Sequence, residues 1–316
     1  MGAFLLRRCA GFAATLIGAS LVIFLVLEVL PGNAAQTMLG PEAPAETVAA
    51  LAKKLGLDRP PLERYLGWIE GMARGDLGVS YAYGTPVSEL VGPSLALTLP
   101  LAAMAMALNS ALGLALGVYA ASRHNRLGDV AVMGLSQLGI AMPTFWLAIL
   151  LILLFAVELG WFPAGGFPGW SAGLWPGLRA LILPAVALAI VQSAVLARVT
   201  RAAVLDVMRE DFVRTARAKG MSAAAALRRH VLRNAMIPIV TVMGLQFSNL
   251  IVLTIVVESV FSLPGLGHLV LNAIANRDLV VVRDVVMLLA ALVVAVNFAV
   301  DLLYAAIDPR LSLRAL

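Results

Sequence analysis

Long apolar stretches alternate with short polar ones along most of the chain. An apolar helix needs about 20 residues to cross the roughly 30 Å of hydrocarbon in a bilayer. Stretches of this kind predict membrane spans at residues 9–30, 95–121, 129–157, 180–201, 235–258 and 284–307. The pattern therefore favours a bundle of about six transmembrane helices.

Composition agrees with that pattern. Hydrophobic residues make up 61% of the chain, charged residues make up 13%, and the mean hydropathy is +0.94. Soluble domains average roughly 45–50% apolar and 25% charged residues. We therefore predict an all-α integral membrane protein in which residues 1–316 form one transmembrane domain.

Small residues and prolines within the spans indicate how the helices pack. The stretch Ser110–Gly117 carries Gly, Ala and Ser at close spacing, which lets helix backbones approach one another in lipid. Pro100, Pro143 and Pro184 lie inside or beside spans, where neighbouring helices can satisfy the freed carbonyl groups. Kinked and closely packed helices are expected.

The distribution of basic residues predicts the orientation. Lys and Arg are enriched in cytoplasmic segments next to spans, and most of the 23 Lys and Arg residues fall inside if the N-terminus is cytoplasmic. Both termini and residues 202–234 are then inside, and residues 31–94 are outside. Arg7 and Arg8 would also suit a cleaved signal peptide, but the apolar run after them is longer than a usual signal core.

The outer segment, residues 31–94, mixes turns with an amphipathic stretch at residues 45–55 and an aromatic one around Tyr65 and Trp68. We expect it to fold against the outer face of the bundle, because its apolar side chains need a surface to cover. It is either a passive cap or a docking platform for an external partner, and the sequence leaves both open.

Ordered charges mark the inner segment, residues 202–234. Acidic Glu210 and Asp211 precede basic Arg214 and Arg217, which suits the dipole of a short helix, and Glu210 and Arg214 have the spacing of a favourable pair. Gly220 follows as a helix stop. The alternative is an interfacial linker that anionic lipid holds through these basic residues.

The next residues predict a second helix after the turn. Ser222 is a good N-cap residue, and the pattern after it continues as helix through Arg233 into the fifth span. The inner segment should therefore read helix, turn, helix between two membrane spans.

Short motifs along nearly the whole chain match those of one transporter family. They are Leu6-Arg7-Arg8, Leu30-Pro31-Gly32, residues 55–60, residues 75–80, residues 142–146, residues 211–220, residues 232–238, residues 261–267 and Asp308-Pro309-Arg310. Each is weak alone, but their order and spacing together are specific. The chain resembles permease subunits of the dipeptide, oligopeptide and nickel type of ATP-binding-cassette (ABC) importers, in particular the first of the two dipeptide permeases.

That resemblance implies a type I importer permease fold and a share in the import pathway for dipeptides or oligopeptides. The alternative is the same architecture importing nickel chelates, glutathione, opines or oligosaccharides. In this family a cytoplasmic loop, the EAA motif, places a short helix in a groove of the ATPase subunit. Here Arg214-Thr215-Ala216 stands where the general motif has Glu-Ala-Ala, so the glutamate is absent. The resemblance assigns the coupling role to the segment as a whole: Glu210, Asp211, Phe212, Arg214, Thr215, Ala216, Arg217, Lys219 and Gly220.

The resemblance also implies the partners. They are a second homologous permease, two cytoplasmic ATPase subunits and an extracytoplasmic substrate-binding protein, around a chain embedded in the lipid of a bacterial inner membrane. Because the sequence lacks a phosphate loop of the form GxxxxGK[ST], ATP and magnesium are expected on the ATPase subunits. For this chain we expect no catalytic residue, no cofactor and no nucleic acid partner. A metal site is not expected either, since its three histidines are scattered.

Ionisable residues within spans are functional candidates, because burying them in lipid is costly. Glu258 lies near the outer end of the fifth span, and Asn297 and Asp301 lie four residues apart on the sixth. Structural pairing with a neighbouring helix and lining of the transport pathway are both open. A secondary transporter is disfavoured because no internal repeat is evident, and a membrane enzyme is disfavoured because the spans hold only isolated carboxylates.

Overall fold

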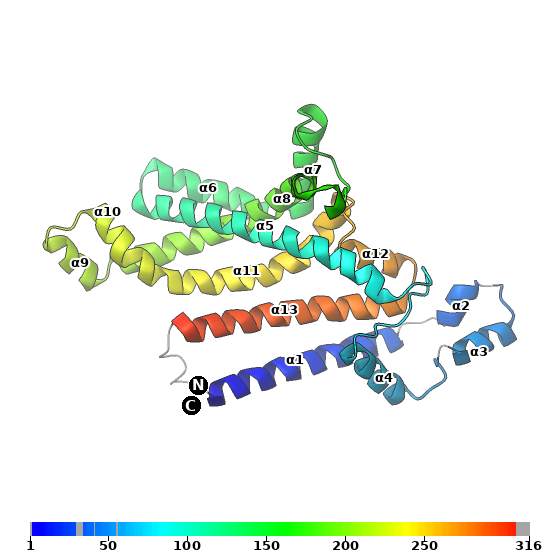
Figure 1. Ribbon diagram of the computed structural model, residues 1–316. Coiled ribbons are helices and arrows are strands. Elements are labelled where there is room, and N and C mark those ends of the chain that lie inside the picture. The colour runs from blue at the N-terminus through cyan, green and yellow to red at the C-terminus, as the bar shows by residue number, and fades with distance from the viewer. Residues whose placement is uncertain (1, 30–33, 41, 55, 308–316) are drawn as a thin grey trace. The chain divides into compact units, whose positions relative to one another are not determined.

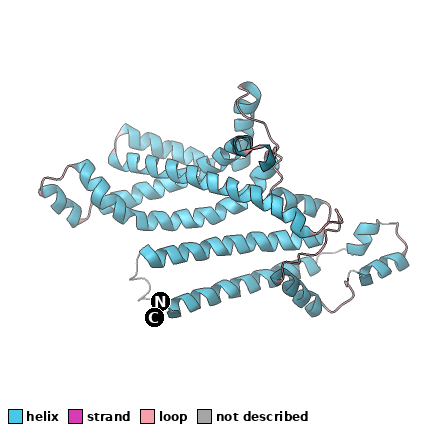
Figure 2. Ribbon diagram, viewed as in Figure 1, coloured by secondary structure: helices cyan, strands magenta, loops and turns pink. Residues whose placement is uncertain are grey.

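The computed structural model describes residues 2–29, 34–40, 42–54 and 56–307. Helices make up nearly all of this part of the chain (Figures 1 and 2). They are α1 (Gly2–Val29), α2 (Ala34–Leu39), α3 (Ala45–Lys54), α4 (Pro61–Ala73), α5 (Val87–Ser122), α6 (Leu127–Ala141), α7 (Thr144–Leu151), α8 (Leu174–Met208), α9 (Asp211–Ala218), α10 (Ala223–Ala226), α11 (Leu232–Val260), α12 (Leu266–Ala275) and α13 (Leu279–Ile307). Short π-helices cover Ile152–Glu158 and Leu227–Val231, and a 3₁₀ turn covers Trp170–Ala172.

Five helical stretches in the described residues are long and apolar enough to cross a membrane, and a bent pair makes up to six. The five are α1, α5, α8, the continuous run from α10 through α11, and α13. The all-α fold with about six spans is therefore confirmed. The helices are longer than the apolar runs: α5 begins at Val87 and α8 continues to Met208, because polar flanking residues also remain helical.

The third predicted span, residues 129–157, bends far more sharply than the kink expected near Pro143. It is divided into α6 and a second helix, Thr144–Glu158, with a bend of 102° between them. Met142 at the break is extended, with φ −84° and ψ 128°. Pro143 explains this conformation, because its ring disfavours the helical region for the residue before it. This segment is a broken span or a re-entrant loop.

The chain divides into two compact units. The first comprises the chain up to Thr98 together with residues 264–298, and the second comprises residues 99–263 together with the end of α13. In the first unit, α4 packs through Trp68 against Phe24 of α1 and Met287 of α13. Trp68 Nε1 also donates a hydrogen bond to Asp284 Oδ1 at 2.6 Å. The outer segment therefore folds against two spans, as its aromatic residues suggested.

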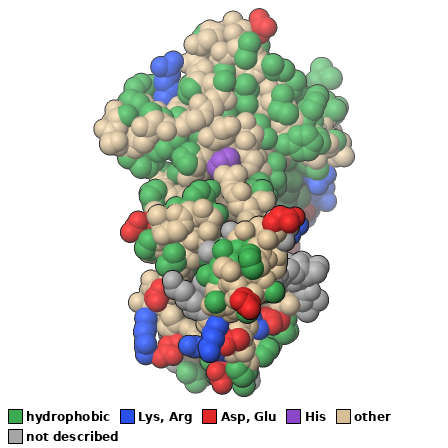
Figure 3. Space-filling view, turned by 90° about the vertical axis from the view of Figure 1, so that its right-hand side faces the viewer, with side chains coloured by type: hydrophobic (Ala, Val, Ile, Leu, Met, Phe, Trp, Pro, Cys, Tyr) green, Lys and Arg blue, Asp and Glu red, His purple; other side chains and the backbone are tan. Residues whose placement is uncertain are grey.

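A second contact fastens the outer segment just before α5. The Asp278 carboxylate accepts hydrogen bonds from Ser80 Oγ at 2.5 Å and from the Ala82 amide at 3.0 Å, and Asp278 and Ser80 are both buried. The loop closes through a bridge between Val79 and Pro86. Acidic and basic side chains gather over the helices of the outer segment on the face that Figure 3 shows.

The second unit is built around α8, which packs against α6, α7 and α11. Gly113 and Gly117 of α5 also approach it closely. A Cβ atom at Gly113 would lie 2.6 Å from Leu196 Cβ, and one at Gly117 would lie 2.6 Å from the Ala197 carbonyl oxygen. Only glycine permits this approach, and the packing role predicted for Ser110–Gly117 is confirmed at these two positions.

Candidate functional site

Within the inner segment, residues 202–234, a sharp turn separates α8 from α9. Helix α8 ends at Met208, and α9 starts at Asp211 after Glu210, which is extended at the N-cap with φ −67° and ψ 146°. Asp211 lies in the first turn of α9 and Arg217 in the last. Both charges are placed favourably for the helix dipole, as the sequence predicted.

The ion pair on α9 differs from the one expected. Arg214 Nη1 lies 3.4 Å from Asp211 Oδ1, at a spacing of three residues, and the predicted pair with Glu210 is wrong. The reason is that Glu210 stands outside the helix in an extended conformation, so it does not share the helical face with Arg214. Both paired side chains are largely exposed, and the pair contributes little to stability.

The turn after α9 has the predicted form. Gly220 adopts φ +90°, a region that favours glycine, directly after the C-cap residue Lys219. Ser222 then caps α10, its Oγ accepting a hydrogen bond from the Ala225 amide at 3.3 Å. The second helix runs through the π-turn at residues 227–231 into α11. The segment is thus a helical hairpin that joins α8 to α11.

Helix α9 has one buried and one exposed face. Val213 is buried in a hydrophobic cluster with Val204 of α8, Ala226 of α10 and Ile239 of α11. Phe212 is 44% exposed although it is a large aromatic residue. It borders an open pocket of about 470 Å³ that is also lined by Thr215, Ala216, Lys219, Gly220, Met221 and His230. The hairpin is therefore anchored through Val213 to α8 and α11, and its other face presents a mixed polar and aromatic surface.

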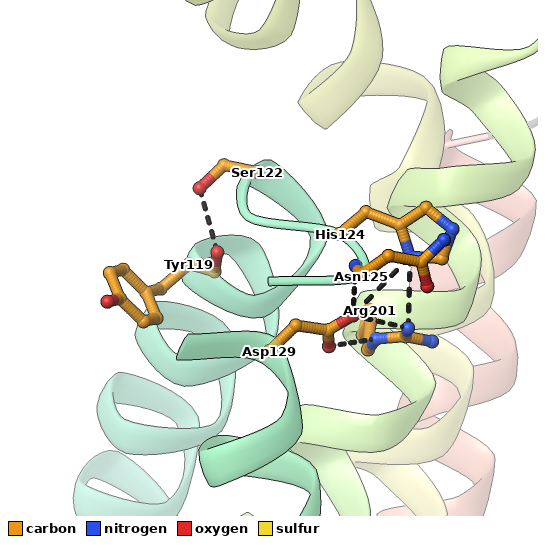
Figure 4. A network of polar contacts seen from close by, with 6 residues as sticks. All are labelled: Tyr119, Ser122, His124, Asn125, Asp129 and Arg201. Carbon is orange, nitrogen blue, oxygen red and sulfur yellow. Dashed lines mark hydrogen bonds and ion pairs between the residues drawn. The ribbon is translucent and has the colours of Figure 1, made fainter. Parts of the chain in front are cut away.

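A partly buried ion pair joins α6 to α8, within the same unit (Figure 4). The carboxylate of Asp129, in the first turn of α6, accepts from Arg201 of α8 through Nε at 2.6 Å and through Nη2 at 2.7 Å. It also accepts a hydrogen bond from the backbone N–H of Asn125 at 3.0 Å. Arg201 Nη2 lies 3.1 Å from His124 Nδ1. The same nitrogen lies 3.4 Å from Asp129 Oδ2, so His124 is a further member of this cluster.

The turn between α5 and α6 is shaped to meet this ion pair. Asn125 has φ +61°, which is uncommon outside glycine but tolerated by asparagine, and this conformation aims its amide at Asp129. Figure 4 also shows Ser122 Oγ donating to the Tyr119 carbonyl oxygen at 2.7 Å, where α5 ends. The sequence pattern gives only a short polar interval between the spans at 95–121 and 129–157, and it does not indicate a partner on α8.

A polar contact also joins three helices inside the second unit. Asn109 Nδ2 of α5 donates to Gln246 Oε1 of α11 at 3.0 Å, and Gln246 Nε2 donates to the Gln192 carbonyl oxygen of α8 at 2.8 Å. Asn109 and Gln246 are both buried. Sequence reasoning missed this contact too, although two amide side chains in apolar stretches were the available signal.

The predicted intramembrane residues lie on two helices. Glu258 is fully buried on α11, and its backbone carbonyl oxygen accepts a hydrogen bond from the Leu263 backbone N–H at 2.8 Å. Asn297 lies on α13 and is partly buried, while the side chain of Asp301 lies outside the described residues. Within the described residues, no group of three or more His, Cys, Asp or Glu side chains could hold a metal ion.

Comparison with known proteins identifies the family. Residues 113–313 match the family described as binding-protein-dependent transport system inner membrane component, and residues 1–102 match the N-terminal region of the same kind of component. The chain belongs to this permease family. It is therefore a permease subunit of an ABC importer, as its motifs predicted.

Two curated relatives of the permease match over nearly their whole length. A putative peptide transport system permease protein of Brucella suis biovar 1 is 41% identical over 98% of this chain and 99% of its own length. The glutathione transport system permease protein GsiC of Salmonella choleraesuis is 40% identical over 98% of each chain. Two such names at similar identity define the family but not the cargo.

Solved structures support the fold of the permease. A chain of the inward-facing MetNI methionine ABC transporter aligns with a TM-score of 0.57 and 19% identity, covering 68% of this chain and 94% of its own. A chain of an amino acid ABC transporter solved with histidines aligns with a TM-score of 0.55 and 18% identity, covering 69% and 94%. The type I importer permease fold is thus confirmed.

Proposed function

We propose that residues 202–234 couple the permease to cytoplasmic ATPase subunits, with α9 as the docking helix. The observation that carries this proposal is the division of α9 into two faces. Val213 anchors the helix in the cluster formed with α8 and α11, whereas Phe212, Arg214 and Arg217 are exposed. A partner that pushes on the exposed face moves a rigid hairpin, and the hairpin moves both helices to which it is joined.

The partners in this proposal are a second homologous permease, two ATPase subunits that bind ATP and magnesium, and a substrate-binding protein outside. The permease itself has no phosphate loop and transmits motion without hydrolysing nucleotide. Both termini and the hairpin are cytoplasmic in this arrangement, since the basic residues concentrate on that side. The folded outer segment lies on the side of the binding protein and offers it a charged surface.

For the cargo we propose short peptides. Peptide and glutathione permeases resemble the chain at 41% and 40% identity, and glutathione is itself a tripeptide. Both cargoes carry peptide bonds, a free amino group and free carboxylates, so one pathway chemistry can serve either. Uptake of a radiolabelled dipeptide and of radiolabelled glutathione, measured in vesicles that contain the whole transporter, separates them. Accumulation of neither, with uptake of a nickel chelate or an oligosaccharide instead, would contradict the peptide proposal.

A proline at Gly220 tests the coupling role. Gly220 has φ +90° and its amide donates to the Arg217 carbonyl oxygen at 3.0 Å, whereas proline fixes φ near −65° and has no amide hydrogen. Gly220→Pro should disrupt the end of α9, lower ATP-driven uptake at least tenfold and reduce the amount of ATPase subunit that co-purifies. Membrane insertion should be unchanged.

Gly75→Pro is the matched control for this experiment. Gly75 follows α4 as Gly220 follows α9, has φ +80°, and its amide donates to the Met72 carbonyl oxygen at 3.1 Å. A Cβ atom would meet no other group at either position. The Gly75 variant should keep its ATPase subunits. Equal loss of ATPase from both variants would point to general misfolding, and normal coupling in Gly220→Pro would remove the role assigned to the hairpin. If only anionic lipid held α9, ATPase recovery would not change.

A further inference from the structure

The ion pair between Asp129 and Arg201 occupies a particular place along the chain. Arg201 lies on α8 about two helical turns before that helix ends at Met208. The hairpin with α9 begins directly afterwards. Asp129 lies at the start of α6, next to the turn that ends α5. The pair therefore links the base of the hairpin to the turn between α5 and α6.

The contact is built to fix an angle and not only a distance. The guanidinium group of Arg201 meets both oxygens of the carboxylate, which orients two planar groups relative to each other. The Asp129 side chain is only 4% exposed. One of its oxygens also accepts a hydrogen bond from the backbone N–H of Asn125 in the α5–α6 turn. Arg201 is 23% exposed, and a partly buried pair of this kind adds little net stability compared with apolar side chains of similar size. What the pair provides is a fixed orientation between the Arg201 and Asp129 side chains.

We propose that Arg201 and Asp129 are positioning residues that make the cytoplasmic end of α8 and the α5–α6 turn move as one body when the hairpin is displaced. The close contacts of Gly113 and Gly117 with α8 join α5 to the same body. Displacement of α9 is then transmitted to α5, α6 and α8 together instead of being absorbed by bending at the end of α8. The proposal rests on the coupling role of the hairpin.

Two variants test the pair in the purified transporter with its ATPase and binding-protein partners. Arg201→Lys keeps the positive charge but loses the two-point contact. The double variant Asp129→Asn with Arg201→Gln removes both charges without leaving an unpaired one. Arg198→Lys is the control, because Arg198 lies one turn earlier on α8 and makes a single contact, at 3.3 Å, with Gln137.

The decisive measurement is the number of labelled dipeptide or glutathione molecules taken up per ATP hydrolysed, normalised to assembled transporter. We expect at least a fivefold lower ratio for both pair variants, with ATPase subunits still bound, and an unchanged ratio for Arg198→Lys. A merely structural role would lower uptake and hydrolysis in proportion and leave the ratio unchanged.

An unchanged ratio in either assembled pair variant, or failure of both to assemble, would overturn the proposal and leave the pair a structural role. Failure of this proposal can be told apart from failure of the coupling role proposed for the hairpin. In that case Gly220→Pro would also transport normally, whereas here Gly220→Pro remains inactive.

Discussion

Two buried aspartates in the permease hold loops to helices through different chemistry. In the second unit, Asp129 meets the guanidinium group of Arg201 at two points. In the first unit, Asp278 accepts from the Ser80 hydroxyl and from backbone amides, one of them of Ala82. Charge-assisted, two-point contacts are the stronger and more directional kind. The loop before α5 is therefore fixed in place, whereas the α5–α6 turn is tied to α8 by a contact that also sets an angle.

Removing one partner of the charged pair should have the largest effect on stability. Arg201→Met leaves the buried Asp129 carboxylate without its arginine, and we expect a loss of about 2–3 kcal/mol in the free energy of unfolding, less than for a fully buried pair because Arg201 is 23% exposed. Unfolding of the purified chain by titration with SDS measures this change in the free energy of unfolding. Adding Asp129→Asn removes the unpaired charge and should recover most of the loss. If the double variant were as unstable as the single one, Asp129 would not be the reason for the effect.

Removing the hydroxyl from the outer loop should have an intermediate effect. Ser80 Oγ donates to the buried Asp278 carboxylate at 2.5 Å and accepts from the partly buried Tyr83 backbone N–H at 3.0 Å, so Ser80→Ala removes one partner from each group. We expect a loss of about 2 kcal/mol by the same titration. Transport per ATP should not change, because this contact only holds the loop.

Ser110→Ala is the control for that prediction. Ser110 Oγ donates only to the Met106 carbonyl oxygen of its own helix, at 2.7 Å, and its loss should be close to neutral. A fall in transport per ATP in Ser80→Ala would show that the outer loop also transmits motion, which would break the contrast between the two aspartates.

The features that the sequence predicted well are local. Span number follows from the length of apolar runs, and the turn at Gly220 follows from one residue type after an amphipathic stretch. The break at Pro143 was only half predicted, because proline within a membrane helix either kinks it or divides it. Asp129 and Arg201 lie 72 residues apart, and no local pattern pairs them. One acidic residue at the start of an apolar helix was the only available signal.

The smallest effect should come from a charged pair without burial. Glu70 lies on α4 and Arg74 at its C-cap, with 2.5 Å between Oε1 and Nη2. This is as short as the contacts of Asp129, but the Arg74 and Glu70 side chains are 74% and 61% exposed. Glu70→Gln should change the free energy of unfolding by less than about 0.5 kcal/mol, because water screens the pair and both side chains lose entropy in forming it. SDS titration beside Arg201→Met makes the comparison direct. Equal losses would mean that distance decides the strength of these pairs, whereas the expected difference assigns the effect to burial.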